Sequence, residues 1–269
     1  MTTNAVQDHL KAGELDEAIG LMNAEIRANP KDTNRRAMLV ELLCFAGNLE
    51  RADTVLDAIS TVDPGAAVGV AMVRQLVRAE QARQQFYSEG RVPEFVKKPG
   101  GAMELELRAA IALREGASGE AASLLAEAEA IRPRAPGTVD GVAFDDFRDL
   151  DDLSAAHFEV LTATGKYYWV PVESITSLEF RPPGRRRDLL WRRAAMTVTE
   201  GPDGEVFIPA IYPFRGAAAT PRYRLGYATD FLGEETGPKF GIGLRTFLVG
   251  DDSRTILELG KLEFVKPAA

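Results

Sequence analysis

Few side chains in this chain of 269 residues have the chemistry that catalysis requires. The two histidines, His9 and His157, lie far apart in the sequence and in different predicted domains, so we interpret each as a structural or surface histidine. The single cysteine, Cys44, follows two leucines on an apolar helical face, where a buried and unreactive thiol is usual. The sequence contains no phosphate-binding loop, nucleophile elbow or metal-ligand spacing. It therefore predicts a protein that is not an enzyme, without catalytic residues, cofactor or metal.

Two clusters of like charge could nevertheless bind a ligand. The acidic cluster consists of Asp145, Asp146, Asp149, Asp151 and Asp152. Carboxylates suit a divalent cation, but the glycine and closing glutamate of an EF-hand loop are missing, so a solvated loop is the preferred interpretation. The basic cluster consists of Arg181, Arg185, Arg186, Arg187, Arg192 and Arg193. A solvated face is preferred here too, because the net charge of −8 is spread over both halves and argues against a general nucleic-acid surface.

An internal repeat organises the elements of the first half. Gly, Leu and Ala of the segment Gly13–Ala18 recur in Gly47–Ala52, an offset of 34 residues that equals the tetratricopeptide length. Closing prolines recur at the same offset, and a third copy begins at Gly119. The apolar spacing predicts helices that precede each copy and one longer helix in the middle, at Asn4–Lys11, Thr33–Ala46, Ala66–Tyr87 and Ala102–Glu115. The segment Gly90–Gly101 is predicted to be a loop.

The second half has a different pattern, of short strands separated by turn residues. A linker near Arg132–Asp140 divides the chain into predicted domains 1–135 and 136–269. We expect one helix at Leu150–Thr164 and strands at Tyr167–Pro171, Ile175–Phe180, Ala195–Thr199, Val206–Ile211, Gly241–Val249 and Thr255–Phe264. The segment Glu200–Glu205 is typical of a hairpin loop. The fold class is thus α+β and multidomain, with a TPR-like α-α superhelix followed by a small antiparallel β-rich, barrel-like domain.

Aromatic residues in the second half admit two interpretations. Tyr167, Tyr168 and Trp169 alternate along a strand, so Tyr168 must face opposite to its neighbours. In the first interpretation Tyr167 and Trp169 belong to the core and Tyr168 is partly exposed. In the second, Tyr168, Trp191 and Tyr212-Pro213 form an aromatic docking surface for a partner, to which Arg185, Arg186 and Arg187 could contribute.

Several motifs of the second half resemble those of a known family. They are Gly165-Lys166-Tyr167-Tyr168-Trp169-Val170-Pro171, Asp188-Leu189-Leu190-Trp191, Pro209-Ala210-Ile211-Tyr212-Pro213 and Arg224-Leu225-Gly226. Together with the repeats they resemble the ImpE family, also called TagJ or SciE, over nearly the whole chain. The run Arg185-Arg186-Arg187 departs from the family pattern, where a less basic connection is expected. A role for these arginines that the whole family shares is therefore in doubt.

The resemblance implies an accessory protein of a bacterial type VI secretion system. Members are similar in being non-enzymatic partners of the small sheath subunit and, through it, of the ClpV ATPase. The repeat array itself predicts a concave helical surface on Thr33–Ala46, Ala66–Tyr87 and Ala102–Glu115 that suits an amphipathic helix. Lack of a signal peptide or spanning segment and a lone cysteine predict a cytoplasmic protein. A binding module for another partner, nucleic acid included, and an uncharacterised hydrolase are the alternatives.

Overall fold

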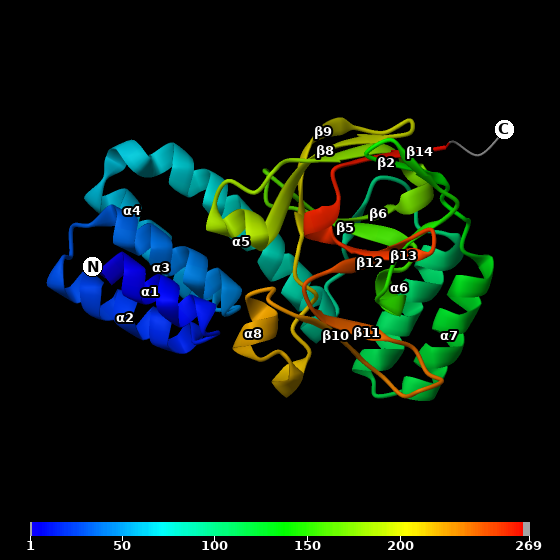
Figure 1. Cartoon of the computed structure of the whole chain (residues 1–269), viewed down its shortest axis with the longest axis horizontal. Coiled ribbons are helices and arrows are strands. Elements are labelled where there is room, and N and C mark those ends of the chain that lie inside the picture. The colour runs from blue at the N-terminus through cyan, green and yellow to red at the C-terminus, as the bar shows by residue number, and fades with distance from the viewer. Residues whose placement is uncertain (1, 266–269) are drawn as a thin grey trace.

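The computed structural model describes residues 2–265, and its first half is a stack of helices (Figure 1). The helices are α1 (Thr2–Lys11), α2 (Leu15–Ala28), α3 (Thr33–Phe45), α4 (Leu49–Val62), α5 (Ala67–Glu89), α6 (Gly101–Arg114) and α7 (Ser118–Ile131). Three hairpins, α1–α2, α3–α4 and α6–α7, flank the longer helix α5, so the predicted TPR-like half is confirmed. No helix in the described part of the chain is long and apolar enough to cross a membrane.

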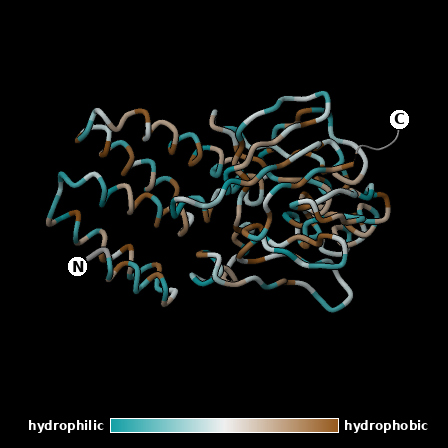
Figure 2. The backbone as a smooth tube through the Cα atoms, turned by 45° about the horizontal axis from the view of Figure 1, so that its top comes forward, coloured by the Kyte–Doolittle hydropathy of each residue, from teal (hydrophilic) through white to brown (hydrophobic). Residues whose placement is uncertain are grey.

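Caps and small residues explain why these helices form and stack. Asp32 and Asn48 accept the backbone N–H three residues later at 3.1 and 3.3 Å, which satisfies donors that the first turns of α3 and α4 leave free. Gly47 precedes α4 with a φ of +76°, a backbone conformation that glycine adopts without strain. Ala18 and Ala52 are completely buried, and their small side chains allow neighbouring helices to approach closely. Figure 2 shows hydrophobic and hydrophilic residues alternating along the helices, as amphipathic packing requires.

The second half is built around a nine-stranded sheet with the strand order β1-β6-β5-β9-β8-β7-β14-β2-β3. Its strands are β1 (Glu94–Phe95), β2 (Gly137–Val139), β3 (Val142–Phe144), β5 (His157–Thr162), β6 (Tyr167–Pro171), β7 (Ile175–Phe180), β8 (Trp191–Val198), β9 (Asp203–Pro209) and β14 (Lys261–Phe264). All pairs are antiparallel except β1 with β6. The first and last strands do not pair with each other, so the sheet is open rather than a closed barrel.

Two smaller sheets complete the strand-rich half. They contain β4 (Phe147–Asp149), β12 (Thr246–Val249) and β13 (Asp252–Thr255), and β10 (Thr229–Leu232) with β11 (Phe240–Gly243). The predicted strands Gly241–Val249 and Thr255–Phe264 are therefore each interrupted. In the first, Gly243 has a φ of +84°, and a Cβ there would lie 1.9 Å from the carbonyl oxygen of Ala228, so the chain must bend between β11 and β12.

Two predictions of secondary structure are wrong. The predicted helix Leu150–Thr164 contains a short 3₁₀ turn followed by strand β5. Phe158 and Leu161 lie on opposite faces of this strand and are both completely buried, so its apolar residues do not alternate and imitate a helix. The predicted loop Gly90–Gly101 contains β1, which adds a parallel edge strand to the sheet.

One hydrophobic core joins the two halves of the chain. It contains Leu76 and Phe86 of α5 together with Trp169 and Trp191 of the sheet, and the ring centroids of Phe86 and Trp169 are 4.8 Å apart. A second core lies within the strand-rich half. The division into domains 1–135 and 136–269 stays a prediction, since the helices end at Ile131 but the first core crosses that boundary.

Candidate functional site

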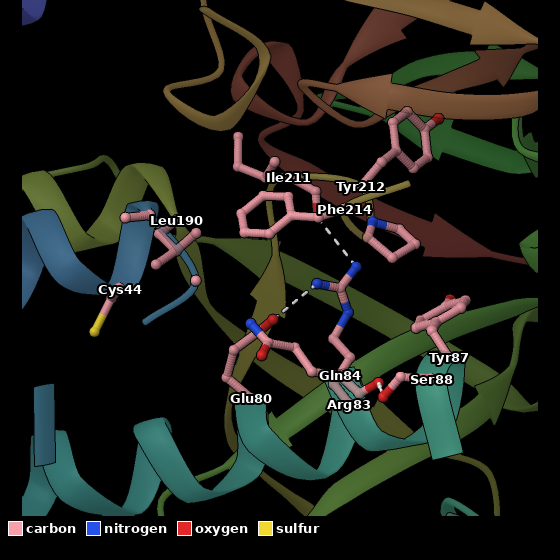
Figure 3. A pocket seen from close by; sticks show the side chains of 13 residues that line it. Cys44, Glu80, Arg83, Gln84, Tyr87, Ser88, Leu190, Ile211, Tyr212 and Phe214 are labelled. Atoms are coloured by element: carbon pink, nitrogen blue, oxygen red, sulfur yellow. Dashed lines mark hydrogen bonds and ion pairs between the residues drawn. The ribbon is translucent and has the colours of Figure 1, made fainter. Parts of the chain in front are cut away.

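A buried cluster of charges connects helix α5 to the sheet. Arg83 of α5 donates from Nε and Nη2 to the two carboxylate oxygens of Glu159 on β5, each at 3.0 Å. Its Nη1 donates to Glu80, one turn earlier on α5, at 3.1 Å, and Nη2 also donates to the Ile211 carbonyl at 3.1 Å (Figure 3). A paired geometry of this kind fixes both distance and angle between the two elements. The cluster therefore sets how the helical half sits on the sheet.

Glu159 is the centre of this cluster. It also accepts hydrogen bonds from the hydroxyl groups of Tyr167 at 2.6 Å and Tyr87 at 3.1 Å, and from the guanidinium of Arg245. Burial by itself would raise the pKa of this carboxyl. The two arginines, Arg83 and Arg245, outweigh burial and hold the pKa of Glu159 well below its usual range. Glu159 is therefore ionised at neutral pH.

The cluster continues to the small sheets through Asp149 and contains one carboxyl group in excess. Arg245 lies 3.2 Å from Asp149, and the Tyr212 hydroxyl donates to the same carboxyl at 2.7 Å. Three buried carboxyl groups, of Glu80, Glu159 and Asp149, thus share two guanidinium groups. Burial, which Arg245 only partly offsets, raises the pKa of Asp149 to about 7. Burial also raises the pKa of Glu80, so the cluster retains a proton in weakly acidic solution.

The predicted aromatic docking surface is not formed. Trp191 and Tyr212 are only 2% and 1% exposed, and Pro213 is buried beside them. The Trp191 indole donates to Glu80 at 3.0 Å, so this side chain belongs to the junction between the halves. The first interpretation of the β6 aromatics, in which they belong to the core, is correct. Tyr167 and Trp169 are buried, and only Tyr168 is partly exposed.

A groove runs between the helical half and the segment that follows β9 (Figure 3). Its main cavity, of about 290 Å³, lies over the C-terminal half of α5 and is bordered by Leu190, Ile211 and Phe214. A smaller cavity of about 60 Å³ lies between α3, α4 and α5, and Cys44 and Leu190 border both. Burial, reinforced by Glu80 and Glu41, raises the pKa of the Cys44 thiol far above its usual range, so it is not a nucleophile at neutral pH. The groove suits apolar side chains.

Only part of the predicted concave helical face is open. Glu106 of α6 accepts the backbone N–H of Ala156 at 2.8 Å and contacts His157 at 2.7 Å. One side of the C-terminal half of α5, which carries Arg83 and Phe86, is likewise packed against the sheet. The prediction that all three inner helices line a free groove is therefore wrong for α6, whereas α5 is covered on one side only and still borders the main cavity through Gln84 and Ser88. What remains open is the part of α3 and α5 that borders the two cavities of the groove, from Ala37 to Cys44 and from Val73 to Ser88.

The histidines and the acidic cluster belong to local structure. His9 pairs with Glu14 at 2.7 Å, and His157, which lies on β5 and not on the predicted helix, stacks on Trp169 with ring centroids 3.7 Å apart. Each aspartate of the acidic cluster has an arginine partner; the pairs are Asp145–Arg134, Asp146–Arg132, Asp149–Arg245, Asp151–Arg215 and Asp152–Arg148. Asp149 and Asp151 are 1% exposed, so a solvated loop is the wrong interpretation for these two. Within residues 2–265 no three such side chains are arranged to hold a metal ion.

The basic cluster divides into two groups. Arg192 is buried and donates to the carbonyl groups of Arg181 and Ile256 at 3.0 and 2.9 Å, while Arg181 pairs with Glu179 and Arg193 with Glu205. A solvated face is therefore the wrong interpretation for Arg192. The other group is the arginine triplet, Arg185–Arg187, whose guanidinium groups form no ion pair with any residue in the described range 2–265.

Sequence reasoning missed the charges that join the halves, although a signal for them exists. Glu80 and Arg83 share the apolar stripe of α5 with Leu76 and Phe86, at helical spacing. Glu159 interrupts an apolar run in the same way. Ionisable residues on otherwise apolar faces are rarely buried without partners, so such interruptions indicate a paired cluster.

Each half of the chain matches a family of known proteins. Residues 9–76 match the tetratricopeptide repeat family, which makes this a TPR-containing protein. Residues 141–263, in the strand-rich half, match the family described as ImpE protein. A relative from Pseudomonas aeruginosa, named type VI secretion system accessory component TagJ, is 27% identical over 96% of this chain and 90% of its own length. The X-ray crystal structure of a Vibrio parahaemolyticus protein superposes with a TM-score of 0.91 at 27% identity, over 98% of each chain.

Proposed function

We propose that this protein is a non-enzymatic adaptor of a bacterial type VI secretion system that binds the small sheath subunit in the cytoplasm. Through that subunit it would be linked to the ClpV ATPase. The observation that carries the proposal is the likeness to the accessory component TagJ, which extends over 96% of this chain and so includes both halves and their junction. A helical repeat array with an open groove is a usual means of binding a helix of another protein.

The state of the ionisable groups supports a role without catalysis. Glu80, Arg83 and Glu159, whose pKa values are strongly shifted, are buried and engaged with one another. Shifted pKa values often mark active sites, but ion-pair networks that hold a structure together shift them as well. Here the shifted groups join two parts of the fold, and the thiol near Glu80, that of Cys44, has a raised pKa because of its burial.

The groove defines the proposed mode of binding. Its walls come from α3, from α5 between Val73 and Ser88, and from Leu190 and Phe214, and apolar side chains of α3, Leu190, Ile211 and Phe214 face the polar side chains of α5. An amphipathic helix of the sheath subunit would place its apolar face here, with anchors at positions i, i+3, i+4 and i+7. Phe214 is half-buried at the rim and offers an aromatic surface of the kind that dominates binding energy.

Calorimetric titration of the full chain with a small sheath subunit from the same organism tests the proposal. We expect binding by the natural protein and a loss of about tenfold or more for Phe214→Ala, since central aromatic anchors contribute about 2 kcal/mol or more. Tyr227→Ala, at an aromatic residue 47% exposed and outside the groove walls, is the matched control. No binding to the intact subunit would refute the adaptor function.

The strand-rich half offers a second location that the same titration separates. Tyr168 borders a cavity of about 480 Å³ together with Phe95, Val96 and the β8–β9 hairpin. If Tyr168→Ala abolished binding while Phe214→Ala did not, the partner would dock on the sheet and the helical groove would be the wrong site.

A further inference from the structure

The arginine triplet, Arg185–Arg187, is a concentration of unpaired positive charge in an acidic protein. It lies in the connection between β7 and β8, and the chain as a whole carries a net charge of −8. Arg185 is exposed and its two neighbours are partly exposed. Since no carboxylate within residues 2–265 forms an ion pair with the triplet, the fold leaves these cations available to another molecule.

The connection that carries the triplet is held in one conformation. The carboxylate of Asp188 accepts the backbone N–H groups of Gly184 at 2.9 Å and Arg185 at 2.8 Å. Immediately afterwards Leu190 and Trp191 are buried in the core shared by the two halves. A ligand would therefore meet guanidinium groups whose backbone is already ordered, which lowers the entropy lost on binding.

The triplet stands at the edge of the groove. Arg187 borders the smaller cavity together with Glu41 and Ala37 of α3 and Val73 of α5. In Figure 3, Leu190, at the end of the same connection, lies beside the helix that carries Cys44. A helix seated in the groove would thus place the polar side chains of its flank within reach of the triplet.

Charge at this edge is compensated only in part. Glu41 faces the triplet, but burial outweighs the attraction of Arg186 and Arg187 and raises the pKa of Glu41. Arg187 has a lowered pKa because of its burial and of repulsion from Arg185. The rim thus holds repelling cations together with one partly buried carboxyl group, an arrangement that additional negative charge would stabilise.

We propose that the arginine triplet selects acidic side chains on the helix that occupies the groove, so that the partner's helix carries Asp or Glu beside its apolar anchors. The inference rests on the proposed function and names the chemistry of its partner. Arginine forks match carboxylates in geometry and charge, and complementary charges raise both the rate of encounter and the discrimination between partners. In the free protein Glu41 borders the same cavity as Arg187 without an ion pair to any residue in the range 2–265, and would compete with the partner's carboxylates for the positive charge.

Replacement of the triplet tests the inference. The variant Arg185→Gln, Arg186→Gln, Arg187→Gln is titrated with the sheath subunit at about 0.05 M and about 0.3 M NaCl, where screening differs strongly. We expect binding about 5- to 30-fold weaker than that of the natural protein at low salt, and a smaller change with salt, as three partly exposed ion pairs would produce. The control variant Arg27→Gln, Arg108→Gln, Arg222→Gln removes the same charge at exposed positions outside the groove and stays within about twofold.

Each outcome separates the two proposals. Unchanged affinity and salt dependence in the triplet variant would overturn the selection of acidic side chains and leave the adaptor function intact. No binding by the natural protein would remove both. Glu41→Gln provides an independent measurement, because loss of the competing carboxyl should strengthen binding by about two- to fivefold. Weaker binding by Glu41→Gln would contradict the inference, as would tighter binding of a single-stranded oligonucleotide than of the sheath subunit.

Discussion

Glu159→Gln is the substitution that most directly tests how the two halves are joined. The amide keeps the size of the side chain but removes the charge that Arg83, Arg245 and two tyrosine hydroxyls share. Arg83 then keeps only Glu80 as an ionic partner, and Arg245 only Asp149. Removing one member of a buried ion pair costs about 3 to 5 kcal/mol, because it leaves a buried charge without compensation. In a chain of this size that corresponds to a fall in Tm of about 6 to 20 °C.

Thermal unfolding followed by circular dichroism and calorimetry at neutral pH measures this change. Glu205→Gln is the matched control, since Glu205 pairs with Arg193 at the surface with both side chains about half exposed, 47% and 52%. Such a pair contributes less than about 1 kcal/mol. If Glu159→Gln unfolded within about 1 kcal/mol of this control, the buried cluster would not be what fixes the helical half on the sheet, and the reasoning would be refuted.

Three further predictions concern the same junction. The natural protein should lose stability as the pH rises from about 5 to 8. The folded state releases the proton of Asp149 in this range, because the pKa of Asp149 is raised to about 7, whereas the unfolded chain has already lost that proton near pH 4. Asp149→Asn should flatten the slope of Tm against pH across this range, and an equal slope in the variant would contradict the assignment. Gly47→Ala should destabilise more than Gly13→Ala in denaturant titrations, by about 1 kcal/mol or more, since both have a positive φ but only the first places a Cβ 2.8 Å from Phe214. A fragment of residues 1–133 should retain helical circular dichroism but unfold at lower temperature than the full chain, because α5 loses its cover; an unchanged Tm would show that the halves fold independently.

The helical half could be predicted from the sequence because its information is local. The 34-residue repeat fixes helix length, turn position and the small residues at helix crossings, as Gly13 and Gly47 show. Strands β6 and β7 were predicted with the bounds that the structure has, since Gly165 and Pro171 delimit them. Strand β5 could not be predicted, because both of its faces are buried and it has no period of two.

The candidate site was less predictable because its interactions are not local. Arg83 meets Glu159 across 76 positions, and Arg245 meets Glu159 across 86. No pattern within one element gives such a pairing. The basic cluster was visible in the sequence, but only the structure separates the arginine triplet, Arg185–Arg187, from neighbours that already have partners. The sequence left two interpretations of the aromatic residues open for the same reason, since the burial of Trp191 depends on the helix that packs over it.

The groove exists only while the two halves are docked, which couples partner binding to the buried cluster. Helix α5 contributes Val73 to the groove at one end, and further along it contributes Arg83 to both the groove and the cluster. Arg187 and Leu190 reach the groove from the connection between β7 and β8. A partner that touches both sides stabilises the docked arrangement by about 2.7 kcal/mol at a concentration one hundred times its Kd. That is comparable to the lower end of the expected loss in Glu159→Gln. Saturating sheath subunit should therefore recover much of the Tm of this variant, whereas a partner bound to α3 alone would stabilise the helical half and leave the docking of the sheet unrepaired.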